Sequence, residues 1–240
     1  MQYLVFNTRR ALFGSARMRR AVNYAIDRPA LARLDLLIGA GRPTDQTLPY
    51  GVPGFRDAQI YPLGGPDLAR AKHLAGGRGG RGIMLTCNIE PCTTAAQTVQ
   101  ANMRPLGITL DVRQVSFSAL FDKLRDPAEP WDISTAGWIS DYADPSDFVS
   151  TLFDSSDRGQ VNYGGFHDRA WDRRIRAAAA LSGSARLRAY GRLDAELARG
   201  PAPIAPFSNT TARDLFSARI GCQTYQPLYG IDLAALCVRR

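Results

Sequence analysis

The sequence predicts an α/β fold, in which helices cover a sheet, and two observations carry that prediction. Between residues 83 and 138, short apolar or alternating runs typical of strands are separated by longer runs whose apolar residues recur every three or four positions. The chain has 240 residues, 45% of them hydrophobic, which is enough to bury a substantial core. Strand, helix, strand, helix and strand in succession favour a sheet with helices on its faces.

The first expected elements are a short strand at 3–5 and a helix capped by Ser15. Apolar residues of this helix recur at helical spacing and should form one buried stripe. The stripe consists of Met18, Ala21, Val22, Ala25 and Ile26. Asp27 is the expected cap of a second helix, which has a proline in its first turn, extends through Ile38 and ends at Gly39.

A helix at 67–74 is followed by the glycine-rich stretch 76–82 and a strand at 83–86. The stretch invites comparison with RGG segments that bind RNA, but it is a single copy without interleaved aromatic residues. It also lacks the Gly-Lys-Ser/Thr ending of a phosphate-binding loop. We therefore interpret it as a flexible connection between the helix and the strand.

The next helix has either Thr93 or Thr94 as its cap and stops at Gly107. A strand with alternating apolar residues follows at 108–112, so that strand, helix and strand form a β-α-β unit. Ser116 should cap the following helix, and the chain returns as a strand at 131–138. The residues of that helix expected to point inward are Leu120, Phe121 and Leu124.

The turn at 138–145 is the candidate binding site, because ligands of such sheets usually lie outside the carboxyl ends of the strands. A carboxylate at the mouth of a partly dry cleft suits an ammonium group, since charge-assisted hydrogen bonds strengthen as water is excluded. Asp141 is the candidate for that contact. Asp144 precedes a proline and is interpreted instead as the cap of the helix that carries Phe148, Val149, Leu152 and Phe153.

Two aromatic residues flank Asp141. Trp138 and Tyr142 are candidates to wall the pocket and to take up apolar or cationic groups, although Trp138 equally suits the core. Beyond the turn, a further helix should bury one stripe, a second should open at Ser184, and a strand should follow at 201–207. The first stripe consists of Trp171, Ile175, Ala178 and Ala179.

Several of these segments together resemble one family. Phe-Asn-Thr at 6–8, followed by Arg-Met-Arg-Arg-Ala-Val-Asn-Tyr-Ala-Ile-Asp-Arg at 17–28, closely resembles the opening of the second lobe in family 5 extracellular solute-binding proteins. These are the dipeptide, oligopeptide and nickel receptors of ABC importers. The Pro/Gly loop 48–54, the helix 67–74 and the turn 138–145 are similar to later segments of the same lobe.

The resemblance implies a type II periplasmic-binding-protein-like lobe, a sheet flanked by helices, with a C-terminal segment that returns toward a missing first lobe. It divides the chain into an entry strand or hinge at 1–7, the second lobe at 8–204, and a hinge return with a first-lobe segment at 205–240. Apolar side chains of the last segment should then be exposed, which favours association.

The resemblance also implies a function. The protein would capture peptides or similar small solutes between two lobes and deliver them to a membrane permease, outside the cytoplasm and without a cofactor. Asp141 would meet the α-amino group of a peptide. Asn162, in the stretch Val-Asn-Tyr-Gly-Gly-Phe, would lie near the cleft, although asparagine and paired glycines are also ordinary turn residues.

Four cysteines allow three fully paired connectivities. In an oxidising compartment Cys87 could pair with Cys92, and Cys222 with Cys237, of which the second pair is favoured because it would staple the returning tail. A buried free thiol is the alternative.

Charge, hydropathy and the N-terminus bear on functions other than a solute receptor. The net charge of +8 comes almost entirely from arginines spread over many helices, so nucleic-acid binding is not expected. No apolar run is long enough for a membrane helix, and the N-terminus lacks the apolar region of a signal peptide, which an exported relative would carry upstream.

The alternatives to a solute receptor are a truncated receptor remnant, a hydrolase that uses Asp141 with Asp144, and a basic RNA-binding module. No enzyme motif favours the second.

Overall fold

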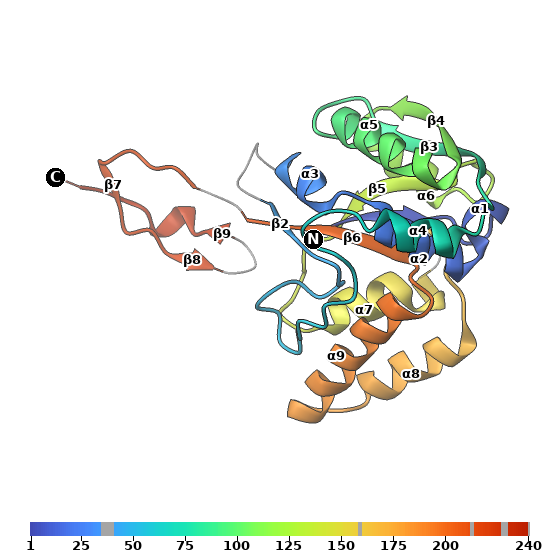
Figure 1. Ribbon diagram of the computed structural model, residues 1–240. Coiled ribbons are helices and arrows are strands. Elements are labelled where there is room, and N and C mark those ends of the chain that lie inside the picture. The colour runs from blue at the N-terminus through green and yellow to red at the C-terminus, as the bar shows by residue number, and fades with distance from the viewer. Residues whose placement is uncertain (35–40, 158–159, 212–213, 227–229, 240) are drawn as a thin grey trace.

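A computed structural model of the chain describes residues 1–34, 41–157, 160–211, 214–226 and 230–239. Its centre is one mixed sheet of six strands in the order β2-β6-β1-β5-β3-β4 (Figure 1). These strands are β1 (Gln2–Phe6), β2 (Gly41–Pro43), β3 (Gly80–Cys87), β4 (Ile108–Val115), β5 (Ile133–Gly137) and β6 (Ile204–Thr210). The sheet flanked by helices confirms the predicted fold class.

The sheet combines a parallel half with an antiparallel half. β3 is parallel to β4, with Gly80 opposite Ile108, and also parallel to β5. β1 is antiparallel to both of its neighbours, β5 and β6. The parallel half contains the predicted β-α-β unit. The pairing of the first strand, β1, with the late strand β6 near the centre of the sheet was not predicted.

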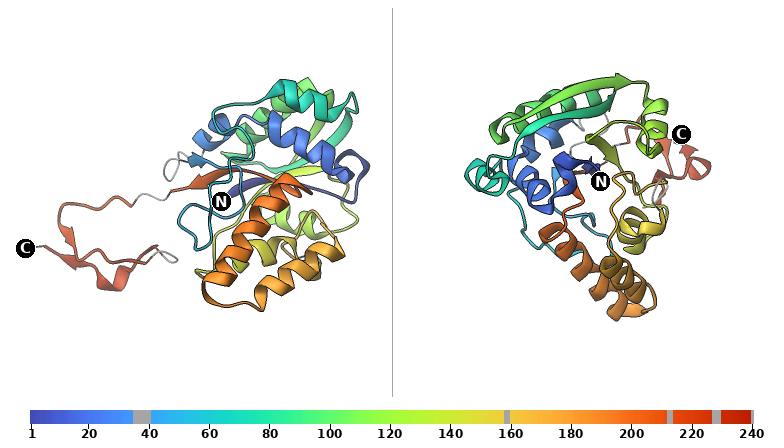
Figure 2. Two further views of the ribbon diagram at one scale, coloured as in Figure 1. Left: turned by 60° about the horizontal axis from the view of Figure 1, so that its bottom comes forward. Right: turned by 90° about the vertical axis from the view of Figure 1, so that its right-hand side faces the viewer.

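Helices cover both faces of the sheet (Figures 1 and 2). Leu4 and Phe6 of β1 point into a core shared with α2 to α5, while Tyr3 and Val5 point into a second core shared with α6 to α9. The described helices are α1 (Ala11–Gly14), α2 (Ala16–Ala25), α3 (Arg28–Arg33), α4 (Leu68–Ala75), α5 (Cys92–Met103), α6 (Phe117–Arg125), α7 (Ser146–Phe153), α8 (Arg169–Ala179) and α9 (Gly183–Arg199).

Most predicted helix starts are confirmed. Ser15, Asp27, Asp67 and Ser116 each accept a backbone N–H of the first turn of their helix, a contact worth about 1 kcal/mol. All five residues of the predicted stripe from Met18 to Ile26 are buried. The predicted end of α3, at Ile38 and Gly39, lies outside the described residues.

Three predicted details are wrong. α5 begins at Cys92, before Thr93 and Thr94, because the Glu90 carboxylate accepts the hydrogen bonds of the Thr93 hydroxyl and the Thr94 N–H and so takes the capping role. α9 begins one residue before Ser184. Ala179, which was predicted to be buried, is exposed. Asp172, which was not part of the predicted stripe, is buried, and its carboxylate accepts two hydrogen bonds from Ser155.

The loop between β2 and α4 is fixed by buried charges. The guanidinium of Arg28 donates to the carbonyl oxygens of Thr44 and Pro206, both at 3.0 Å. The buried carboxylate of Asp194 on α9 accepts from Gln46 Nε2 at 3.0 Å and from the Thr47 N–H at 2.8 Å. Desolvation raises the pKa of Asp194 to about 6.

The C-terminal segment, residues 214–239, projects away from the sheet (Figures 1 and 2). Its described residues form short elements, the strands β7 (Ile220–Gly221), β8 (Tyr225–Gln226), β9 (Gly230–Ile231) and β10 (Cys237–Val238) and the 3-10 helix η4 (Leu233–Ala235), and a disulfide joins Cys222 to Cys237. Leu215 is 95% exposed and Leu233 is 75% exposed.

The predicted domain boundary between residues 204 and 205 falls inside β6, which stays in the sheet as far as Thr210. The division of the chain into lobes remains a prediction.

Candidate functional site

Several chain segments meet at one edge of the sheet. The parallel strands β3, β4 and β5 all end there, and the turn at 138–145 follows β5 directly. β1 is antiparallel to both β5 and β6. It therefore begins at the edge where those two strands end, and Gln2 lies opposite Gly137 and Ser208. The predicted turn is therefore at the carboxyl edge expected for a ligand site.

One buried carboxylate organises the turn. Asp147, in the first turn of α7, is 1% exposed, and its Oδ2 atom accepts a hydrogen bond from the Asp141 N–H at 2.9 Å. The same atom accepts from Trp138 Nε1 at 3.3 Å. Desolvation raises the pKa of Asp147. Trp138 is half-buried and packs against the second core, which was one of its two expected roles; its role as a wall of the ligand site stays a prediction.

The two residues at the tip of the turn face solvent. Asp141 is exposed, and its carboxylate has no hydrogen bond or ion pair within the part of the chain that the structure describes. The Tyr142 side chain is 48% exposed, and its hydroxyl lies 3.5 Å from Ser146 Oγ. The turn thus presents a free carboxylate beside an aromatic ring, and its backbone is held by the hydrogen bond to Asp147.

Asp144 has a structural role. Its Oδ1 atom accepts the Ser146 N–H at 2.9 Å, which agrees with its interpretation as a cap, although α7 itself begins at Ser146. Arg186 of α9 donates to both carboxylate oxygens, at 3.0 and 2.9 Å. These hydrogen bonds are the main reason that the pKa of Asp144 falls to about 2. An acid occupied in this way is not free for a ligand.

Asn162 lies elsewhere. It is 3% exposed, and its amide is used within its own loop, donating to the Phe166 carbonyl at 2.9 Å and accepting the Phe166 N–H at 3.0 Å. It lines a cavity of only about 10 Å³ beside β1 and β6, and not the pocket next to the turn. The structure therefore does not bring Asn162 together with Asp141, and we do not include it in the candidate site.

A mainly apolar pocket of about 370 Å³ lies at the same edge. The residues that define it come from six elements or their ends and include Gln2, Leu31, Cys92, Phe117, Thr135 and Phe207. Gln2 links this pocket to the start of the turn, because its side chain lies across Gly137: a Cβ atom there would be 2.7 Å from Gln2 Oε1. No local sequence pattern predicts this pocket, because its lining residues come from segments far apart in the chain.

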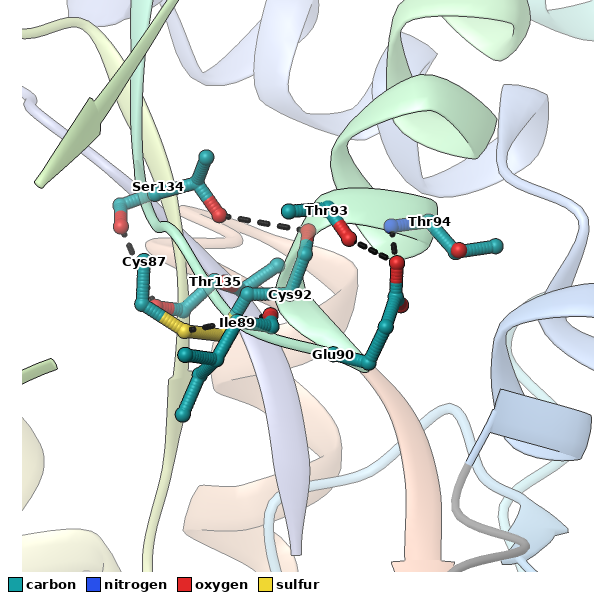
Figure 3. Close-up of a disulfide and its surroundings, with 9 residues drawn as sticks. Cys87, Ile89, Glu90, Cys92, Thr93, Thr94, Ser134 and Thr135 are labelled. Carbon is teal, nitrogen blue, oxygen red and sulfur yellow. Dashed lines mark hydrogen bonds between the residues drawn. A yellow bond between two sulfur atoms is a disulfide. The ribbon is translucent and has the colours of Figure 1, made fainter. Parts of the chain in front are cut away.

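The loop between β3 and α5 forms one wall of this region (Figure 3). A disulfide joins Cys87, which is buried, to Cys92, which lines the pocket. Ile89 and Phe117 are each more than half exposed, at 53% and 54%. Apolar side chains that face solvent around a pocket are typical of a binding surface.

Comparison with known proteins agrees with this arrangement. Residues 1–160 match the model of the family described as bacterial extracellular solute-binding proteins, family 5 Middle. The chain is 25% identical to Heme-binding protein A of Haemophilus influenzae, over 96% of this chain and 43% of the relative. It is 24% identical to Probable di/tripeptide-binding protein 5 of Pseudomonas aeruginosa, over 99% of this chain and 46% of the relative.

A solved structure shows the same fold. The structure of HbpA2 from Haemophilus parasuis superposes with a TM-score of 0.84 at 19% identity, covering 100% of this chain and 48% of the other. The predicted type II lobe architecture is thereby confirmed. The chain spans less than half the length of these relatives. Because the family match covers two thirds of the sequence, the chain belongs to the bacterial extracellular solute-binding proteins of family 5.

Proposed function

We propose that this chain is the second lobe of a solute-binding receptor that captures peptides, or similar small solutes with an ammonium group, and delivers them to an ABC permease. The observation that carries the proposal is the unpartnered, exposed carboxylate of Asp141 at the same sheet edge as an apolar pocket of about 370 Å³. A carboxylate and an apolar hollow at one edge match the two ends of a peptide's first residue, its ammonium and its side chain.

The other lobe would close over this edge by hinge motion and exclude water from the ion pair. The exposed Leu215 and Leu233 support this, because they are apolar side chains of the segment predicted to return to that lobe. The disulfides Cys87–Cys92 and Cys222–Cys237 support a location outside the cytoplasm, where such bonds persist. The names of the relatives describe binding proteins, which favours binding without turnover.

The test is calorimetric titration of the whole protein that contains this chain with a dipeptide and with its N-acetylated form. A hydrogen-bonded charge contributes about 1.5–3 kcal/mol, so Asp141→Asn should weaken dipeptide binding by about tenfold or more. The acetylated peptide has no ammonium group and should bind weakly to the wild type and equally weakly to the variant. Asp57→Asn, which removes an exposed charge outside the site, is the matched control.

Two results would contradict the proposal. Equal dipeptide affinity in the wild type and in Asp141→Asn would remove Asp141 from the site. Consumption of the dipeptide during titration, lost in Asp141→Asn, would favour the hydrolase alternative. A melting temperature close to that of the wild type is expected for Asp141→Asn, because the carboxylate makes no contact that stabilises the described fold.

A further inference from the structure

A second pocket, of about 400 Å³, lies on another part of the surface. It is formed by α2, by the neighbouring helix α4, by the end of α9 and by residues 59–61, and it shares no residue with the pocket beside the turn. The proposed capture of solutes leaves it without a role. The residues that matter to its chemistry are Arg20, Tyr24, Tyr61, Arg70 and Arg199.

The charge of this second pocket is entirely positive. Arg20, Arg70 and Arg199 line it, and no aspartate or glutamate does. None of the three arginines belongs to an ion pair within the residues that the structure describes. A hollow lined by charges of one sign focuses their field, so three arginines around this pocket favour a negatively charged ligand.

The guanidinium of Arg20 has unused hydrogen-bonding capacity. Its Nε atom is buried and has no hydrogen-bond partner in the described structure. A buried donor without an acceptor costs about 1–3 kcal/mol, which an incoming acceptor would recover. Arg199 uses one nitrogen to donate to the Ala58 carbonyl at 2.9 Å, and its other donors have no partner in the described residues.

Aromatic rings hold the second pocket in shape. The rings of Tyr24 and Tyr61 meet edge to face at 4.8 Å, and the Tyr61 hydroxyl is fixed by donating to the Ala198 carbonyl at 2.6 Å. The guanidinium of Arg70 lies over the Tyr24 ring at 4.4 Å. Rigid walls of this kind lower the entropy cost of holding the arginines in place.

We propose that this second pocket binds an oxyanion of the phosphate class, carried by a small solute or by a lipid headgroup. Planar guanidinium groups donate two parallel hydrogen bonds to phosphate oxygens, and a phosphate has enough charge and acceptors to satisfy several arginines at once. A carboxylate offers only two oxygens and one charge. The hollow is large enough for a phosphate with a small organic substituent.

The experiment uses the full chain and two kinds of probe. Inorganic phosphate and glycerol 3-phosphate, titrated by calorimetry at physiological salt, test the soluble form. Sedimentation with vesicles of phosphatidylglycerol, compared with vesicles of phosphatidylcholine, tests the lipid form. We expect binding to at least one probe, and Arg20→Gln and Arg70→Gln should each weaken it about tenfold, as the loss of a charged hydrogen bond predicts. Arg70→Lys keeps the charge and should weaken it less.

Arg188→Gln is the matched control, because Arg188 is exposed on α9, outside this pocket, and its loss changes the net charge equally. An equal loss of binding in Arg188→Gln would mean general attraction to a basic protein and would overturn the proposal. So would dissociation constants weaker than about 1 mM for the soluble phosphates together with equal sedimentation on both vesicles. If Arg20→Gln does not fold, Arg70→Gln decides, since the Arg70 side chain is exposed.

Discussion

The buried carboxylate of Asp147 fixes the backbone of Asp141, whose N–H donates to Asp147 Oδ2 at 2.9 Å. The exposed acid proposed to meet the ligand is therefore positioned by a second acid six residues later in the chain. Since Trp138 donates to the same oxygen, one carboxylate holds both the Trp138 ring and the backbone of the residue proposed to bind the ligand.

We expect Asp147→Ala to weaken binding of a dipeptide to the whole protein by about tenfold and to lower the free energy of unfolding by about 2 kcal/mol, because two part-buried donors lose their acceptor. Asp147→Asn keeps an acceptor oxygen and should recover most of the affinity. Calorimetry and urea unfolding measure both quantities. Lower stability with unchanged affinity would limit Asp147 to a structural role.

The Asp144–Arg186 pair predicts a stability loss in acid. The pKa of Asp144 is lowered from 3.8 to about 2, so its contribution is complete above pH 4 and is lost as pH falls toward 2. The shift corresponds to at most about 2 kcal/mol, reduced because the side chain is 30% exposed. Asp144→Asn should be less stable than the wild type at pH 7 and equally stable near pH 2, by urea unfolding. Asp122→Asn, at an 82% exposed site, should show no such difference.

Asp194 predicts the opposite dependence. Its pKa is raised from 3.8 to about 6, so the folded state holds a proton that the unfolded state releases, and stability falls as pH rises from about 4 to about 6. The loss from this group is at most about 3 kcal/mol. Asp194→Asn cannot ionise, and its unfolding free energy should change less over this range. Parallel profiles for the two proteins would show that the Asp194 carboxyl is not protonated in the fold.

Reduction of the disulfides should affect the C-terminal segment before the body of the protein. Cys222–Cys237 closes a segment whose described residues form short strands and one 3-10 helix and do not join either hydrophobic core, whereas the sheet is packed on both faces. Limited proteolysis of Cys222→Ser/Cys237→Ser should cut within 214–239 faster than in the wild type, with a nearly unchanged melting temperature. A melting temperature lowered by many degrees would mean that the segment stabilises the body.

The exposed leucines of that segment predict self-association of the isolated chain. Leu215 and Leu233 are 95% and 75% exposed, and large apolar side chains left in water favour contact between copies. Leu215→Ser/Leu233→Ser should shift the chain toward monomer in sedimentation velocity. The control is Leu181→Ser, at a 42% exposed position after α8, which should leave the distribution as it is.

The sequence by itself determined the features that depend on neighbours in the chain. The caps at Ser15, Asp27 and Ser116 follow from side chains that reach a backbone N–H two or three residues later. Helical and strand periodicity likewise predict the β-α-β unit, and the turn at 138–145 could be placed at the end of β5. Asp141 is preferred to Asp144 because Asp144 precedes a proline and suits a cap, and because the family resemblance puts the ligand contact three residues after Trp138.

Only the tertiary structure decided what depends on residues far apart in the chain. The antiparallel β1 lies between β5 and β6, which are more than a hundred residues away, and periodicity does not encode such pairing. The pocket at the edge exists because Gln2, Cys92 and Phe207 meet there. Asn162, expected near the cleft, is instead buried by its own loop, since local sequence does not fix which way a turn faces. Burial, which shifts the pKa of Asp147 and Asp194, is likewise a property of the whole fold.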